Sequence, residues 1–127
     1  MYKRQLVLSD NQLAALPDLG KVLPRLRWLD ASRNALTDCT ALFHCVGLLA
    51  AELAGNRIAR LDGLERAAQL RALGLAGNRL ADELALRPLS LNGALQSLSL
   101  SGNPVAARDG TAPVSYTHLT LPTILLV

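Results

Sequence analysis

The chain has few aromatic residues, few cysteines and no long apolar run, and each shortage narrows what it can be. One Trp, one Phe and two Tyr occur among 127 residues, so an aromatic anchor for a partner rests on very few positions. Cys39 and Cys45 are too few for the disulfide frameworks of secreted repeat domains, which favours two reduced thiols in an intracellular protein. The apolar stretch at 119–127 is shorter than the ~20 residues that cross a bilayer.

A strong excess of one charge is also absent. The formal net charge is +3, and Lys3 and Arg4 at the N-terminal end supply two of these charges. The remaining excess is too small to indicate a nucleic-acid or anionic-membrane ligand. We therefore expect neither membrane contact nor nucleic-acid binding.

Five asparagines divide the chain at nearly equal intervals, and each follows the same arrangement of leucines. Subtracting their positions gives spacings of 23, 22, 22 and 25 residues for Asn11, Asn34, Asn56, Asn78 and Asn103. The copy from Leu70 to Leu80 fits the pattern L-x-x-L-x-L-x-x-N-x-L without substitution. An Asn side chain offers two donors and an acceptor to backbone groups that a turn leaves unpaired, so we predict a structural asparagine ladder.

This frame is identified as a leucine-rich repeat. Asn56 to Glu65, NRIARLDGLE, resembles the short intracellular class of roughly 22 residues, found in regulators of protein phosphatase 1, a spliceosomal ribonucleoprotein subunit, and axonemal, ciliary and centrosomal proteins. The resemblance covers nearly all of Leu6 to Val105, with Ala31, Ala51 and Cys39 departing from the pattern. It implies an α/β fold, a right-handed curved solenoid with a parallel strand face and short convex helices or turns. It also implies a cytoplasmic location, with cytoskeleton, cilium and nucleus as alternatives.

The same frame places the individual elements. Strands are expected at Leu6–Leu8, Leu26–Ala31 and Leu95–Leu100, with helical turns on the convex side at 18–23, 37–46, 61–68 and 81–91. Pro88 and Gly93 should bound the last of these turns. Ala106 to Pro113 is polar and rich in turn residues, and no cap helix is expected there.

Both ends of the chain lie outside the repeat and resemble translated transposase-adapter DNA from sequencing libraries. Tyr2 to Gln5 reads as one orientation of the adapter, and Val114 to His118 reads as its reverse complement. We therefore predict adapter-derived tails at 1–5 and 114–127 around a leucine-rich repeat domain at 6–113, a fragment of about five repeats whose caps are missing. Uncapped ends would permit non-native self-association.

Alternation along each strand predicts which side chains face outward. Trp and Arg are enriched at binding hot spots, and Trp28 is the one aromatic residue of the outward columns. The alternative for Trp28 is packing over the space beside Ala50. The hypothesis for partner binding comprises Arg27, Trp28, Asp30, Glu52, Arg71, Gln96 and Ser99.

Other arrangements offer little catalytic or metal chemistry. Cys39, His44 and Cys45 give three candidate zinc ligands where four are usual, and Cys39 occupies a leucine position that faces the core. No third group marks a catalytic Cys–His pair, and the repeat turns lack the Lys-Ser/Thr of a phosphate loop. We expect no cofactor, no metal and no enzymatic activity.

The sequence therefore favours a protein-interaction scaffold that presents a concave repeat surface to a protein partner. Two alternatives stay open. The repeats could be the targeting arm of a signalling enzyme, or part of a ribonucleoprotein or structural assembly, with the other domains lying outside this chain.

Overall fold

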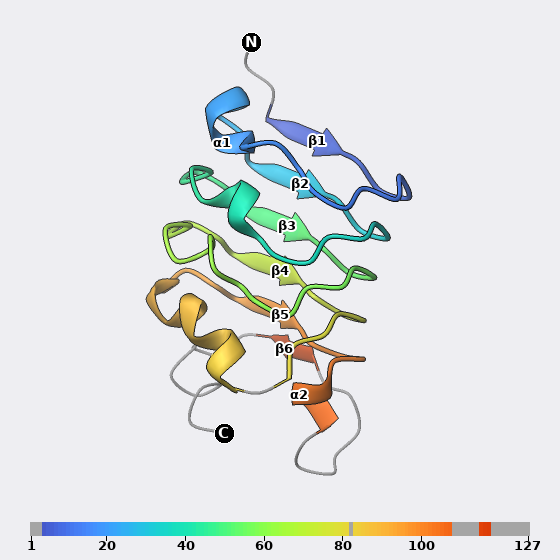
Figure 1. Ribbon diagram of the computed structural model, residues 1–127. Helices are drawn as coiled ribbons and strands as arrows, with labels where there is room; N and C mark the ends of the chain where they lie inside the picture. Colours follow the sequence, from blue (N-terminus) through green and yellow to red (C-terminus); the bar gives the residue numbers. More distant parts are fainter. Residues whose placement is uncertain (1–3, 82, 108–114, 118–127) are drawn as a thin grey trace.

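The structure, a computed structural model that describes residues 4–81, 83–107 and 115–117, is a coil whose turns stack side by side (Figure 1). Each turn contributes one short strand to a single sheet. The five parallel strands are β1 (Gln5–Val7), β2 (Trp28–Asp30), β3 (Ala50–Glu52), β4 (Ala72–Gly74) and β5 (Ser97–Ser99). The predicted leucine-rich repeat solenoid is confirmed, although β1 begins and ends one residue before its predicted bounds.

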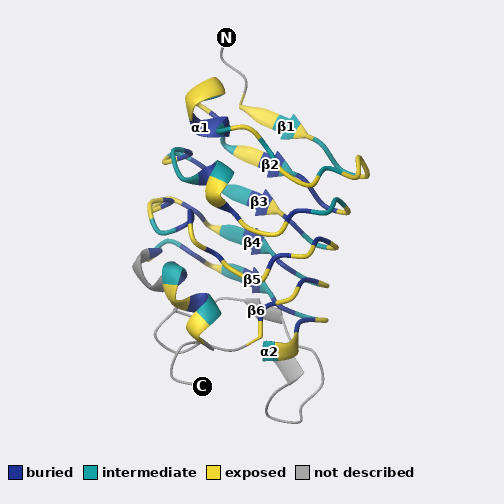
Figure 2. Cartoon of the chain, in the orientation of Figure 1, coloured by how far each residue is buried: buried dark blue, intermediate teal, exposed yellow. Residues whose placement is uncertain are grey.

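The middle residue of each strand points into the coil. Leu29, Ala51, Leu73 and Leu98 are at most 3% exposed, while their strand neighbours are half-buried or exposed (Figure 2). Their Cα atoms are register partners from strand to strand. The inward side chains therefore form one continuous column through the solenoid, as alternation predicts.

The convex side of the third turn follows a period of three residues. Leu64 N–H donates to the Leu61 carbonyl, Ala67 N–H to that of Leu64 and Leu70 N–H to that of Ala67, each at 3.1 Å. All four side chains are buried. A hydrogen bond every three residues brings each third side chain onto the core, so the chain crosses in successive turns. The helix predicted at 61–68 is therefore wrong.

The first convex segment differs because its inward side chains stand four residues apart, whereas the segments of the second and fourth turns keep the spacing of three. Leu23 N–H donates to the Leu19 carbonyl at 2.7 Å, four residues apart, and this turn is the short α-helix α1 (Leu19–Val22). The predicted turns at 37–46 and 81–91 contain the 3-10 helices η1 (Thr40–Leu42) and η2 (Glu83–Leu91). Pro88 lies inside η2 and does not bound it, because proline fixes φ near the 3-10 value.

The sheet ends with a segment that runs the other way. Helix α2 (Pro104–Ala107) starts with a proline at its first position, where the missing N–H costs no hydrogen bond. This four-residue helix includes Ala106 and Ala107, the first two residues of the segment predicted to hold no cap helix, and 108–113 lie outside the described residues. Strand β6 (Ser115–Thr117) pairs antiparallel with β5, and the adapter origin predicted for this segment stays a prediction. A free sheet edge offers unpaired backbone groups to any extended segment.

None of the described helices has the length and apolarity to cross a membrane.

Candidate functional site: the strand face

Asparagine side chains hold the turns that follow the strands. Asn78 Oδ1 accepts the Ile58 N–H at 3.0 Å in the preceding turn, and Nδ2 donates to the carbonyls of Leu53 and Leu75 at 2.9 Å each. Three other asparagines make the same kind of link to the turn before them: Asn34, Asn56 and Asn103. Among the described residues, the side chain of Asn11 donates only to carbonyls of its own turn, and its backbone N–H donates to Asn34 Oδ1 at 3.0 Å. Side-chain bonds therefore reinforce the spacing of the strands.

The residue before each of these asparagines has a left-handed backbone. Its φ lies between 54° and 78° in all five copies: Asp10, Arg33, Gly55, Gly77 and Gly102. Glycine adopts this conformation without a steric cost, whereas Asp10 and Arg33 carry side chains. These two side chains bond each other across neighbouring turns, with Arg33 Nε 2.6 Å from Asp10 Oδ1 and Nη2 2.9 Å from Oδ2.

This ion pair gives a pH prediction. The hydrogen bond from Arg33 lowers the pKa of Asp10 below its ordinary 3.8. The pKa of Asp10 is lower in the folded chain than in the unfolded chain. The pair therefore stabilises the fold fully at pH values above the unfolded pKa, and this contribution is lost as the pH falls through the lowered, folded pKa. NMR titration of the carboxyl carbons should show the low pKa, and Arg33→Gln should raise it. Arg60→Gln, which breaks the separate pair with Asp62, should leave Asp10 unchanged.

Two columns of outward side chains cross the five parallel strands. Their register is set by the backbone pairing, which aligns Trp28 with Ala50 and Asp30 with Glu52. We call this surface the strand face, and its two columns are Gln5, Trp28, Ala50, Ala72, Ser97 and Val7, Asp30, Glu52, Gly74, Ser99. A groove of about 250 Å³ runs along it, lined by all ten residues.

The predicted binding residues separate into two groups. Trp28, Asp30, Glu52 and Ser99 line the groove. Arg27, Arg71 and Gln96 precede their strands and are not among its lining residues. Arg27 is held at this edge, because Nη1 donates to the Gly47 carbonyl at 2.9 Å and to Gln69 Oε1 at 3.3 Å. The role of all seven predicted residues in binding a partner stays a prediction.

Trp28 lies beside Ala50 and is still open to solvent. Its exposed fraction is 47%, and that of Val7 on the next strand is 57%. Ala50 carries only a methyl group, so it cannot cover the indole. Val7 was absent from the predicted binding set, although alternation places it in the same column as Asp30.

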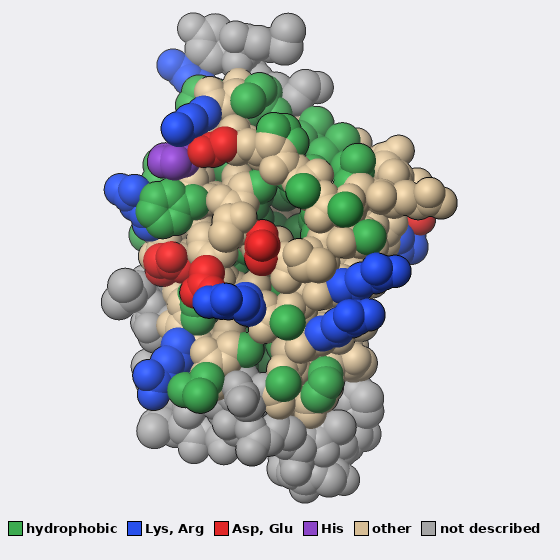
Figure 3. Space-filling model, viewed as in Figure 1, with side chains coloured by type: hydrophobic (Ala, Val, Ile, Leu, Met, Phe, Trp, Pro, Cys, Tyr) green, Lys and Arg blue, Asp and Glu red, His purple; other side chains and the backbone are tan. Residues whose placement is uncertain are grey.

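The strand face holds two carboxylates on neighbouring strands. Asp30 Oδ1 accepts the N–H and Oγ–H of Ser32, at 3.1 and 2.7 Å, and Glu52 Oε1 accepts the Ala54 N–H at 3.1 Å. Within the described part of the chain, neither forms a salt bridge. The Glu52 carboxylate lies over Gly74, where a Cβ would overlap it. On the side of the molecule seen in Figure 3, by contrast, acidic and basic side chains are interspersed.

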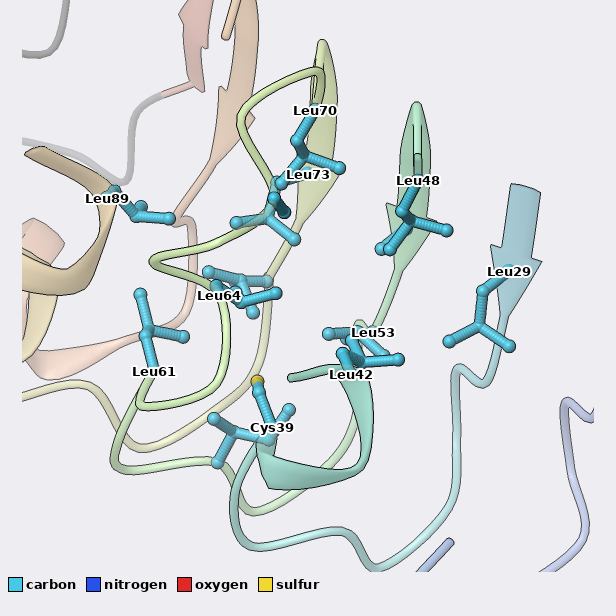
Figure 4. Close-up of a cluster of buried hydrophobic side chains, with 14 of the residues drawn as sticks. Leu29, Cys39, Leu42, Leu48, Leu53, Leu61, Leu64, Leu70, Leu73 and Leu89 are labelled. Atoms are coloured by element: carbon cyan, nitrogen blue, oxygen red, sulfur yellow. The ribbon is translucent and has the colours of Figure 1, made fainter. Parts of the chain in front are cut away.

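The cysteine thiols lie in the core. Cys39 is 2% exposed and packs among leucines (Figure 4), and Cys45 is equally buried. Burial raises the pKa of Cys39 to about 12 and that of Cys45 to about 11. Both thiols are therefore protonated at neutral pH, which disfavours attack or metal binding. Across residues 4–81, 83–107 and 115–117, no three His, Cys, Asp or Glu residues are grouped to hold a metal ion.

Sequence reasoning missed two of the buried polar residues that the structure describes, Ser32 beside Asp30 and Asn92 on the convex side. Asn92 is 1% exposed, and its Nδ2 donates to the carbonyls of Ala67 at 2.8 Å and Leu64 at 3.2 Å. It occupies the convex position that Cys45 and Ala67 fill in the two preceding turns. Aligning the convex period of three residues would have shown a polar residue at an apolar position.

Comparison with known proteins places this geometry among repeat proteins. No protein-family model matches the chain. It is 34% identical over 109 residues to rat leucine-rich repeat-containing protein 56, covering 86% of this chain and 20% of the relative. It is 34% identical over 112 residues to the bovine geranylgeranyl transferase type-2 subunit alpha, covering 86% of this chain and 19% of that subunit.

Among solved structures, the chain resembles one in the crystal structure of the Drosophila melanogaster SNF/U2A' complex. The TM-score is 0.73 and the identity 33%, with 81% of this chain and 60% of that chain covered. The chain spans only 20% and 19% of the lengths of the rat and bovine relatives. The aligned strands, the asparagine-linked turns and these relatives together show that the chain belongs to the leucine-rich repeat proteins.

Proposed function

We propose that the chain is a non-enzymatic protein-interaction scaffold whose strand face receives a segment of a partner protein. The exposed indole of Trp28 in the groove carries this proposal. Covering apolar surface is worth ~25 cal/mol per Å², and a large aromatic side chain on an open sheet gains by being covered. Tryptophan is also the residue type most enriched among binding hot spots.

The similar structures support a protein as the partner. The structure in the SNF/U2A' comparison is that of a complex between two proteins. The two carboxylates of the strand face would repel a polyanion, so Asp30 and Glu52 favour a protein segment over a nucleic acid on this face. Fold alone does not determine function, so the side chains of the groove carry more weight than the solenoid.

A second function is favoured by the match to the bovine transferase subunit. The aligned part is 19% of that subunit, so repeats of this kind occur in a much larger chain that takes part in an enzyme. In this alternative the strand face still binds a protein, and the repeats serve an enzyme as its targeting arm.

Trp28→Ala should weaken a strand-face ligand by ~2 kcal/mol or more, which corresponds to roughly 30-fold in affinity. Ligands can be selected from a random displayed-peptide library on the wild-type protein, and their affinities compared between variants. Leu84→Ala is the matched control, because Leu84 is 62% exposed and lies in η2. A Trp28→Ala variant that loses stability without a selective loss of binding would show that the indole is a packing residue.

A further inference from the structure

We infer that the strand face binds a partner segment in which a Lys or Arg side chain stands next to an apolar one, with the cation over Ala50 between Trp28, Asp30 and Glu52. This inference rests on the proposed function, because it names the chemistry of the segment that the strand face receives. The occupant of the groove is a segment of a protein.

Ala50 is a low point on the strand face. Trp28 is its register partner on β2, and Glu52 stands two residues further along β3 on the same face. Strands lie about 4.8 Å apart and rise about 3.3 Å per residue, so the Cα atoms of Trp28, Asp30 and Glu52 lie within roughly 8 Å of the Ala50 Cα. Ala72 on β4 is equally small. A long side chain can therefore descend onto Ala50 from above and meet three larger neighbours.

Charge selects a cation for this position. Asp30 and Glu52 stand opposite each other on adjacent strands, an arrangement that like charges destabilise. No salt bridge to either is formed by the residues that the structure describes, and the nearby Arg33 is hydrogen-bonded to Asp10 and acts on Asp30 and Glu52 only through the field of its charge. A Lys or Arg from a partner would relieve this repulsion through charge-assisted hydrogen bonds and would also lie against the indole face.

The neighbouring apolar side chain follows from the composition of the groove along its length. Val7 and Trp28 expose apolar surface at the β1–β2 end. The two carboxylates follow on β2 and β3, and Ser97 and Ser99 bring hydroxyl groups on β5. A segment that matches this order carries its apolar residue toward β1 and its cation toward β3.

The test uses three short synthetic peptides that share one Leu/Ala framework and carry Lys, Glu or Gln at the same positions. Trp28 is the one tryptophan of the chain, so its fluorescence reports occupancy of the groove, and amide shifts in ¹⁵N–¹H spectra locate the binding surface. We expect the Lys peptide alone to bind, with shifts centred on β2 and β3. High salt should weaken this binding, because exposed charges are screened.

A matched pair of variants separates the carboxylates from net charge. Asp30→Asn with Glu52→Gln keeps the oxygens that accept the Ser32 and Ala54 N–H groups, and should weaken the Lys peptide about tenfold. Asp38→Asn with Asp62→Asn makes the same change of charge on exposed residues outside the strand face, and should leave the affinity unchanged.

The remaining outcomes overturn the inference in distinguishable ways. Equal binding of the Glu or Gln peptide at the strand face would reject the cation and leave the proposed function intact. Binding of the Lys peptide with shifts confined to the convex side would reject the inference and the proposed function together. Absence of binding by all three peptides would reject the inference.

Discussion

Gly63→Ala should lower the free energy of unfolding by roughly 2–5 kcal/mol. Gly63 is buried in the convex turn of the third repeat, and its φ is 112°. A Cβ at this position would overlap the Cys39 carbonyl and lie 2.9 Å from the Thr40 Cα. These are backbone atoms of the preceding turn, which cannot rotate away as a side chain can. The cost combines a strained backbone with overpacking between two repeats.

Gly93→Ala is the matched control for this substitution. A Cβ at Gly93 would meet no atom within 4 Å, and the residue is exposed. Its effect should lie within about 0.5 kcal/mol, as for most surface changes. Urea denaturation of the two variants beside the wild-type protein measures both effects. Equal stabilities for the two variants would show that the convex turns move apart easily.

The strands and the convex segments were predictable to different degrees. The strands follow from the leucine frame, because alternation places every second side chain inward. The convex path depends on whether inward side chains stand three or four residues apart. Leu19 and Leu23 are four apart and form an α-helical turn, whereas Leu61, Leu64 and Ala67 are three apart and form successive turns. The leucine frame of the repeat does not by itself distinguish these two spacings.

The columns of the strand face were also predictable, but the exposure of Trp28 was not. Alternation and register fix which residues share a column. Exposure depends on the size of neighbours on other strands, here Ala50 on one side and Gln5 on the other. The sequence therefore left packing and binding open for Trp28, and the structure shows an indole that is 47% exposed beside a methyl group.

Asn78→Leu should lower the free energy of unfolding by roughly 2–4 kcal/mol. Asn78 is 5% exposed, and its Oδ1 is the one acceptor for the Ile58 N–H among the described residues. A buried N–H without a partner costs about 1–3 kcal/mol, and a branched side chain in a space shaped for an amide adds about 1 kcal/mol. Thermal unfolding followed by circular dichroism measures the change.

The carbonyls that accept hydrogen bonds from the Asn78 side chain have other donors, and this limits the loss of stability. The Leu53 carbonyl keeps a bond from Asn56 Nδ2, and the Leu75 carbonyl keeps one from Asn103 Nδ2. The unpaired amide of the preceding turn therefore accounts for most of the loss, so the damage should spread toward the N-terminal neighbour. Amide exchange at Ile58 should accelerate more than exchange at Leu80, whose N–H is bonded to Asn103.

Asn11→Leu provides the matched comparison at the first asparagine. Asn11 is exposed, and its side chain accepts no N–H from any residue that the structure describes. Its replacement should change stability by less than about 0.5 kcal/mol. A melting curve for Asn78→Leu that coincides with that of the wild-type protein would mean that water serves the Ile58 amide as well as the asparagine does. The links between turns would then rest on the sheet and the leucine core alone.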